Sequence, residues 1–378
     1  MKKYIVIPDS FKGTLSSQEV CRHMRRGILL ADEKADVVTI PVADGGEGTV
    51  DAFLQAVGGS KRAARVRGPL GETIDSFYGR LSASTAVVEM AAAAGLPLVE
   101  HRKDPEKTTT YGVGQLILQA LEDGATEVIL GLGGSCTNDG GCGMAAALGV
   151  RFYDETGEAF VPTGGTLRRI DRVDAGGLHP LMREAKLRVM CDIDNPLCGP
   201  QGAAAVFAPQ KGADEVMVGR LDAGLAHFAA VVKRDLGSDI LHLPGAGAAG
   251  GMGGGAVALL GGTLQMGIDA VLDTVGFERI LQEAGLVLTG EGKLDGQSLR
   301  GKVIVGVTRY AAKAGVPVFA FAGALVGDSR PFYDAGLTAM FSINRAPLPY
   351  EEAVPHSAEN LAEVVQNAVR CYLAGRNA

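Results

Sequence analysis

The chain has 378 residues, a formal net charge of −7 and 54 glycines, and 47% of its residues are hydrophobic while 21% are charged. This length and balance predict a globular protein of two domains and argue against a disordered chain. Because the net charge is negative and no long Lys/Arg run occurs, nucleic acid is not an expected partner. No apolar stretch approaches the roughly 20 residues that span a bilayer, which excludes a membrane partner and favours a cytoplasmic protein.

The cysteine and histidine patterns give no sign of disulfides or zinc. Six cysteines occur and none forms a C-x-x-C pair, so they are expected to be free thiols in a reducing compartment. The six histidines show no metal-ligand spacing.

The N-terminal segment predicts a β-α-β unit. Residues 4–7 form a short apolar run typical of a buried parallel strand. Ser16 and Glu19 form a capping box before a helix whose apolar residues recur at helical spacing. A second strand is expected over residues 37–42, so the sheet begins parallel.

The pattern changes in the middle of the chain. Short polar-apolar alternations broken by Gly, Pro and Ser indicate antiparallel or mixed strands at residues 66–71, 74–81 and 86–90. Farther along, the sequence predicts a helix at 108–119 and strands at 127–130 and 187–191.

Regular strand and helix alternation returns after about residue 263. The expected strands are 286–288, 316–322 and 339–343, and the expected helices are 303–314 and 359–373. We therefore predict an α/β fold with two domains. Residues 1–62 and 263–378 would form a Rossmann- or flavodoxin-like doubly wound parallel sheet, and residues 63–262 an inserted mixed α/β domain.

Three predicted strands end in a carboxylate, namely Asp9, Asp44 and Asp192. In open α/β sheets, ligands bind beyond the carboxyl ends of the strands, so this placement favours a catalytic or metal-binding role. The alternative is that each Asp caps the turn or helix that follows its strand.

A glycine-rich loop at residues 131–141 follows a predicted strand and leads into an apolar helix. Glycines such as Gly133 and Gly134 let backbone N–H groups converge, and a helix N-terminus adds a positive dipole, which together can cradle phosphate. Ser135 and Asn138 add neutral donors. A purely structural turn is the alternative.

Two further loops carry cations. Residues 296–303 nearly match the phosphate-binding pattern G-x-x-x-x-G-K-[ST], but Val303 replaces the hydroxyl residue. Lys302 is still a candidate phosphate partner at a helix start. Ser10 and Lys12 place a hydroxyl and a cation in the first βα loop, where a small anionic substrate needs them. Solvated surface charges are the alternative for both loops.

Residues 245–250 match G-x-G-x-x-G. The match is weak evidence for a dinucleotide, because chance matches are expected in a glycine-rich chain and no β-α-β unit of the right length surrounds this one. A flexible hinge, a second anion-binding loop or tight packing of helices would also explain these glycines.

Taken together and in order, these motifs resemble the bacterial type-1 glycerate kinase family. The segments that carry the resemblance are residues 7–13, 41–49, 131–143, 191–197, 209–213, 245–254 and 289–302. They span nearly the whole chain. The resemblance implies a cleft between the two domains and phosphorylation of glycerate by ATP with Mg²⁺, at the 2-hydroxyl group.

For this chemistry we expect Asp192 to act as the base or as a Mg²⁺ ligand, and Lys12 and Lys302 to supply positive charge. The loop from Gly133 to Ser135, with Asn138, would cradle phosphate. The remaining candidates would orient substrate hydroxyls or metal-bound water, and they are Asp44, Glu47 and Asp295.

Other functions stay open at this point. They are a glycerate 3-kinase, an NAD-dependent hydroxyacid dehydrogenase based on residues 245–250, and a non-catalytic two-lobed binder of small molecules. The expected partners are glycerate and a nucleotide, and a homodimer is left open. Acidic residues at strand ends argue against the binder, because a binder of an anionic ligand would favour neutral and cationic groups there.

Overall fold

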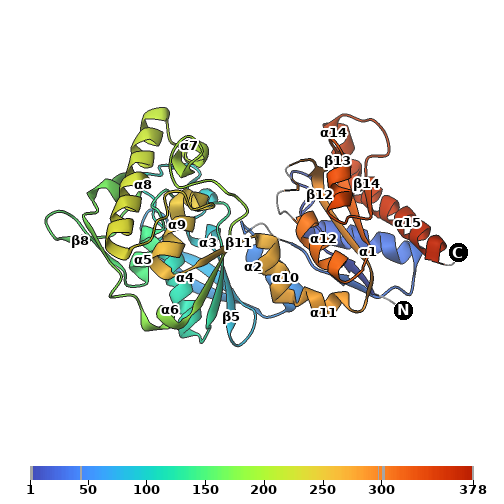
Figure 1. Ribbon diagram of the computed structural model, residues 1–378, viewed down its shortest axis with the longest axis horizontal. Helices are drawn as coiled ribbons and strands as arrows, with labels where there is room; N and C mark the ends of the chain where they lie inside the picture. The colour runs from blue at the N-terminus through green and yellow to red at the C-terminus, as the bar shows by residue number, and fades with distance from the viewer. Residues whose placement is uncertain (1–2, 43–44, 297, 300–302, 377–378) are drawn as a thin grey trace. The chain divides into compact units, whose positions relative to one another are not determined.

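The computed structural model describes residues 3–42, 45–296, 298–299 and 303–376 (Figure 1). The chain divides into two compact units. Unit 1 comprises residues 1–43, 55–57 and 268–378, and unit 2 comprises residues 44–54 and 58–267. The domain boundaries expected from the sequence, at residues 62–63 and 262–263, stay a prediction.

Unit 1 contains a five-stranded sheet in which every neighbouring pair is parallel. Its order is β14-β13-β12-β1-β2, the flavodoxin-like order 2-1-3-4-5 when the strands are counted within the unit. The strands are β1 (Lys3–Val6), β2 (Val37–Thr39), β12 (Ala284–Leu294), β13 (Val318–Leu325) and β14 (Ala339–Ser342). Because β1 pairs directly with β12, the predicted parallel sheet from both chain ends is confirmed.

Helices cover both faces of this sheet. Leu288 and Phe321 share one buried cluster with α1 (Ser17–Ala31) and α15 (Ser357–Arg376), which lie side by side in Figure 1. The alternate residue Val287 is equally buried on the other face, where α12 contacts β12 and β13. The remaining helices of unit 1 are α10 (Gly267–Val275), α11 (Phe277–Leu281), α12 (Val303–Lys313), α13 (Arg330–Asp334), α14 (Tyr350–Ala353) and the 3₁₀ turn η4 (Val354–His356).

Helix α1 begins where the capping box predicts. Ser16 N donates to Glu19 Oε2 at 2.9 Å, and Glu19 N donates to Ser16 Oγ at 3.3 Å. This exchange satisfies two backbone donors that a helix start leaves without partners. Gly27 then allows close contact with α15, because a Cβ at this position would lie 2.4 Å from Ala362 O.

Unit 2 contains a six-stranded mixed sheet with the order β11-β10-β6-β5-β4-β3. The first four strands are parallel and the β5-β4-β3 pairings are antiparallel, so the mixed sheet predicted here is confirmed. Its strands are β3 (Ser60–Arg67), β4 (Thr73–Arg80), β5 (Thr85–Glu89), β6 (Glu127–Gly131), β10 (Lys186–Met190) and β11 (Thr263–Gln265). A small antiparallel sheet is formed by β7 (Arg151–Tyr153), β8 (Ala159–Phe160) and β9 (Arg172–Asp174).

Helices and turns connect these strands. They are α2 (Thr49–Val57), α3 (Ala91–Ala94), η1 (Leu96–Val99), α4 (Tyr111–Glu122), α5 (Cys142–Ala147), η2 (Gly164–Arg169), α6 (Pro180–Glu184), α7 (Ala203–Phe207), η3 (Pro209–Lys211), α8 (Glu215–Leu236) and α9 (Ala248–Leu260). No helix in the described part of the chain is long and apolar enough to cross a bilayer.

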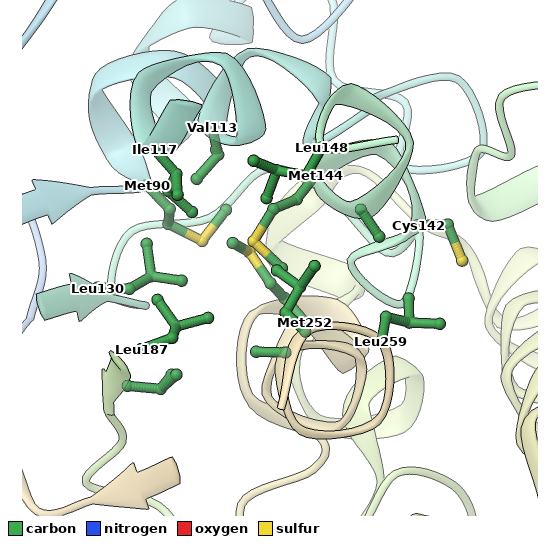
Figure 2. Packing of buried hydrophobic residues seen from close by; sticks show 14 of the residues in the cluster. Met90, Val113, Ile117, Leu130, Cys142, Met144, Leu148, Leu187, Met252 and Leu259 are labelled. Atoms are coloured by element: carbon green, nitrogen blue, oxygen red, sulfur yellow. The ribbon is translucent and has the colours of Figure 1, made fainter. Parts of the chain in front are cut away.

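The core of unit 2 lies between the parallel strands and helices α4, α5 and α9 (Figure 2). Leu130 of β6 and Leu187 of β10 line its sheet side. Met144 of α5 and Met252 of α9 point toward each other in its centre. Unbranched methionine side chains fill irregular gaps between helices that approach at unequal distances.

Helix α9 approaches the chain near residue 140 more closely than a side chain would allow. A Cβ at Gly255 would lie 2.0 Å from Gly140 O, and a Cβ at Gly250 would lie 2.0 Å from Thr137 O. The G-x-G-x-x-G segment therefore serves tight packing. It follows helix α8 and a loop, whereas a dinucleotide fingerprint follows a strand.

We predict that Gly255→Ala lowers the free energy of unfolding by about 1–3 kcal/mol, because the new methyl group meets a backbone oxygen that cannot rotate away. Chemical denaturation measures this loss. Gly219→Ala is the matched control, because Gly219 is an exposed glycine of α8 with no atom within 4 Å of a built Cβ. It should be neutral or stabilise by about 1 kcal/mol through helix propensity. Equal effects of the two changes would contradict the packing argument.

Candidate functional site

Three parallel strands of unit 2 have their carboxyl-terminal ends side by side, at one end of the sheet. Glu89, Gly131 and Met190 are the last residues of β5, β6 and β10, and they lie opposite one another in the register. The segments that leave these strands therefore start from adjacent positions. They include the glycine loop after β6 and Asp192 after β10.

The segment around Gly45 lies against the glycine loop. Gly133 N donates to Gly45 O at 2.9 Å. A Cβ at Gly131 would lie 2.4 Å from Gly45 O, and a Cβ at Gly133 would lie 2.5 Å from Gly46 Cα. Two motifs that are far apart in the sequence thus meet at this end of the sheet, and they can do so because these positions carry no side chain. Glu47 is exposed in the same segment.

Fewer backbone N–H groups of this loop are available to bind phosphate than the sequence predicts. The N–H of Gly133 is already used by Gly45 O. For the N–H groups of Gly134 and Ser135, no acceptor is found among the residues that the structure describes. Gly134 has φ +75° and is exposed, a backbone conformation that glycine adopts without strain. The two donors left for an anion are therefore those of Gly134 and Ser135.

Asp139 holds the rest of the loop and was not singled out in the sequence. Its buried carboxylate accepts four hydrogen bonds, from Thr110 N (2.8 Å), Thr110 Oγ1 (2.8 Å), Gly141 N (3.1 Å) and Gly143 N (3.2 Å). Burial raises the pKa of the Asp139 carboxyl, and the four donors oppose that shift. The carboxylate ties the end of the loop to the start of α4.

These bonds also explain why α4 begins at Tyr111 and not at residue 108 as predicted. The hydroxyl of Thr108 donates to Cys136 O at 2.9 Å, and that of Thr110 donates to Asp139. The threonines before the helix are therefore fixed by contacts with the glycine loop. Long-range contacts of this kind leave no periodic signal in the sequence.

Thr137 and Asn138 occupy the middle of the loop and are fully buried. Thr137 Oγ1 and both amide atoms of Asn138 have no hydrogen-bond partner among the described residues. Each buried group without a partner costs about 1–3 kcal/mol. The loop is therefore not built for stability alone, and Asn138 is not exposed to solvent as a surface donor.

Lys211 is a second residue to which the sequence assigned no role. It is 1% exposed, and its Nζ donates to Ser135 Oγ at 2.7 Å and to Thr137 O at 2.6 Å. Burial lowers the pKa of the Lys211 ammonium to about 8. Its segment, residues 209–213, is one of those that carry the family resemblance, but nothing in that segment predicts a buried cation.

Asp192 lies beyond β10 as predicted and is exposed. Its Oδ1 accepts a hydrogen bond from Gly267 N at 2.6 Å. One carboxylate oxygen thus bonds to the first residue of α10, 75 residues away, which differs from the cap of the following turn that was the alternative for this residue. Its assignment as base or metal ligand remains a prediction.

Glu89 is a buried acid at the same end of the sheet that the sequence did not reveal. Its Oε2 accepts a hydrogen bond from Val50 N at 2.9 Å, near the start of α2. Burial is the main cause that raises the pKa of the Glu89 carboxyl. Glu89 fixes the first turn of α2 and with it the end of the Gly45 segment.

In unit 1 the first βα loop lies at the switch point between β1 and β12, where doubly wound sheets bind ligands. Asp9 Oδ1 accepts a hydrogen bond from Ser10 N at 2.6 Å. Lys12 is exposed, and its backbone N would lie 3.2 Å from a Cβ built on Gly292. The loop that carries Ser10 and Lys12 therefore lies against the end of β12.

The loop after β12 holds the other candidates of unit 1. Asp295 forms an ion pair with Lys293 at 2.9 Å and its N–H donates to Ser298 Oγ at 3.3 Å. The buried Ser298 hydroxyl donates in turn to Glu291. Lys302, the lysine of the segment that nearly matches G-x-x-x-x-G-K-[ST], lies outside the described residues. Asp44 of unit 2 also lies outside them.

No group of three or more His, Cys, Asp or Glu side chains in the described residues is placed to hold a metal ion. Mg²⁺ does not require one, because it keeps several waters and is commonly bound through one or two carboxylates and substrate phosphates. The exposed carboxylate of Asp192 fits a site of that kind.

We predict that Asp139→Asn lowers the free energy of unfolding by about 3 kcal/mol or more, because an amide cannot accept the four bonds and turns a donor toward backbone N–H groups. Thermal denaturation measures the loss. Asp214→Asn is the control: Asp214 caps α8 by accepting from Met217 N, and Asn caps equally well. A melting temperature unchanged in Asp139→Asn would refute the anchoring role.

Similar proteins are found over the full length of the chain. The model of the glycerate kinase family matches residues 4–373. The glycerate kinase of Bacillus subtilis (strain 168) is 46% identical over 367 residues, which cover 97% of this chain and 96% of the relative. The glycerate 2-kinase of Escherichia coli (strain K12) is 43% identical with 100% of both chains covered. A solved structure from Salmonella typhimurium LT2, described as a glycerate kinase 2, has a TM-score of 0.87 and 41% identity and covers 100% of both chains. The chain therefore belongs to the glycerate kinase family.

Proposed function

We propose that this protein transfers the γ-phosphoryl group of ATP to the 2-hydroxyl of glycerate, giving 2-phosphoglycerate and ADP. The observation that carries the proposal is full-length similarity, at 43% identity, to a relative named glycerate 2-kinase. The glycine loop after β6 supports it, because phosphoryl transfer depends on donors that position phosphate oxygens. In this loop the N–H groups of Gly134 and Ser135 are suited to that task.

Positive charge is the second requirement of phosphoryl transfer, since negative charge is spread over the transferring group. We assign this role to Lys12 and Lys302. Lys12 is exposed in the first βα loop of unit 1. Ser10 in the same loop and Asp295 after β12 are assigned to orientation of the bound substrates, together with Asp44 and Glu47.

Asp192 is assigned as the general base for the glycerate hydroxyl or as a ligand of Mg²⁺. A base must accept a proton from the attacking hydroxyl, and an exposed carboxylate at the end of a strand can do so. Bound Mg²⁺ would supply positive charge that offsets the negative charge of the phosphate groups. The residue that would hold it here is Asp192.

The rival functions differ in what they consume and release. A glycerate 3-kinase also uses ATP but places the phosphoryl group on the primary hydroxyl. A hydroxyacid dehydrogenase changes the absorbance of a nicotinamide. The G-x-G-x-x-G segment at residues 245–250, on which that function was based, packs against Thr137 through Gly250. A non-catalytic binder takes up ligand without turnover.

The proposal includes a cytoplasmic location. All six cysteines are described and none is paired. Unpaired thiols in a chain of this length fit a reducing compartment. Measuring the thiol state of the protein isolated from cells under alkylating conditions checks this part.

We predict that the purified protein forms ADP and 2-phosphoglycerate from glycerate and MgATP, and that EDTA stops the reaction. Phosphorus NMR of the product separates the 2-isomer from the 3-isomer in one spectrum. A 3-phosphoglycerate signal would show that the protein is a glycerate 3-kinase instead. Absence of ATP consumption with both enantiomers of glycerate would contradict the kinase proposal.

For Asp192→Asn we predict a fall in kcat by a factor on the order of 10² or more with a nearly unchanged melting temperature. The amide keeps the acceptor for Gly267 N but loses the charge and the ability to take a proton. Steady-state kinetics and thermal denaturation are measured on the same sample.

Asp194→Asn is the matched control, because Asp194 is exposed two residues away and makes the same change of charge. It should keep kcat within a factor of about two, in line with an exposed surface change. A lower melting temperature with wild-type kcat in Asp192→Asn would assign Asp192 a structural role and remove it from the mechanism.

A further inference from the structure

Lys211 is a buried ammonium whose hydrogen bonds, among the described residues, go to no carboxylate. Within the part of the chain that the structure describes, Nζ has two acceptors, Ser135 Oγ and Thr137 O, and both are neutral. A buried cation without a counter-ion is costly, and proteins that retain one commonly use its charge. The nearby acid Asp139 is already committed to four other donors.

The bond from Lys211 directs the Ser135 hydroxyl proton away from Lys211. A serine oxygen has two acceptor lone pairs and one proton to donate. The ammonium occupies one lone pair at 2.7 Å, so the proton must point elsewhere. No acceptor for it is found among the described residues, which leaves Ser135 prepared to donate to an added acceptor.

Ser135 also lies at the part of the loop where backbone donors remain. Its own N–H and that of Gly134 have no acceptor in the described ranges, and Gly134 is exposed. Lys211 itself is 1% exposed and Ser135 is 7% exposed. Two N–H groups and one hydroxyl at adjacent residues thus have no described acceptor, and a buried ammonium bonds to the hydroxyl oxygen.

We propose that Lys211 is a positioning residue that holds the Ser135 hydroxyl as a donor to an anionic oxygen, a phosphoryl or carboxylate oxygen, bound at Gly134 and Ser135. The inference rests on the proposed kinase function for its biological ligand. Lys211 does not touch the anion. It strengthens the Ser135 donor, because a hydroxyl that accepts from an ammonium donates more strongly to an anion.

A merely structural lysine would behave differently. It would hold the turn at residues 209–213 against the loop, and its removal would lower stability without regard to Ser135. If Lys211 acts through Ser135, the two residues are coupled, and losing both costs no more than losing Ser135 alone. A double-mutant cycle separates these cases.

The test compares Lys211→Met, Ser135→Ala and the double variant with the wild-type enzyme. We expect each single change to lower kcat/KM for the substrate bound at the loop on the order of 10- to 100-fold, and the double variant to match Ser135→Ala. Effects that multiply would overturn the proposal. Lys103→Met is the control, since Lys103 is exposed and adjoins the same turn at Gly212, and it should leave kcat/KM unchanged.

A second measurement does not require a folded Lys211 variant. The titratable groups facing Lys211 are Cys136 and Asp139, and burial raises the pKa of the Cys136 thiol to about 12, so it stays protonated. The Lys211 ammonium loses its proton as the pH rises through about 8. We expect kcat/KM of the wild type to fall above that pH and the fall to be absent in Ser135→Ala. An equal fall of kcat/KM at high pH in the wild type and in Ser135→Ala would contradict the proposal.

The affinity for inorganic pyrophosphate, measured by calorimetry, distinguishes a failure of this inference from a failure of the proposed function. Wild-type turnover of glycerate with wild-type kinetics in Lys211→Met would overturn the role of Lys211 alone. If the wild type does not turn over glycerate, the kinase proposal fails, and pyrophosphate affinity then decides the role of Lys211. Weaker binding in both single variants supports it, and unchanged binding in either refutes it.

Discussion

The four donors that converge on Asp139 fix the loop after β6, and most of the candidate site in unit 2 depends on that loop. Thr110 brings the start of α4 to the carboxylate, while Gly141 and Gly143 bring the start of α5. With its end held in this way, the loop presents Gly134 and Ser135 at this end of the sheet. A buried carboxylate can do this because donors on several sides compensate its lost hydration.

The surroundings of the loop have features that stability alone would not favour. Thr137 and Asn138 keep polar atoms without partners in the described structure, and Lys211 buries a charge. Ala249 adopts φ 53° where α9 packs against the loop, a conformation that costs a non-glycine residue energy. Such departures concentrate where a protein binds or reacts, because optimal packing elsewhere can offset them.

Local patterns in the sequence predict most strands of the two large sheets, but they miss helix α8 (Glu215–Leu236) and place at residues 66–71 a strand that the structure has at Ser60–Arg67. The apolar run before Asp9 and the capping box at Ser16 depend on neighbours in the chain, and both are found in the structure. The strand ends locate Asp192 and the glycine loop for the same reason. Asp139, Glu89 and Lys211 were missed because their roles come from partners 29, 39 and 76 residues away, and no periodicity records such contacts. The use of the Gly133 amide by Gly45 was hidden in the same way.

The glycine loop is expected to bind the anionic group on which the enzyme acts. Nitrogen-15 NMR of the labelled protein, titrated with 2-phosphoglycerate and separately with a non-hydrolysable ATP analogue and Mg²⁺, tests it at the atoms concerned. We expect the amide signals of Gly134 and Ser135 to shift with one of these ligands, while that of Gly219 in α8 does not. Saturating binding of both ligands with unshifted Gly134 and Ser135 signals would contradict it.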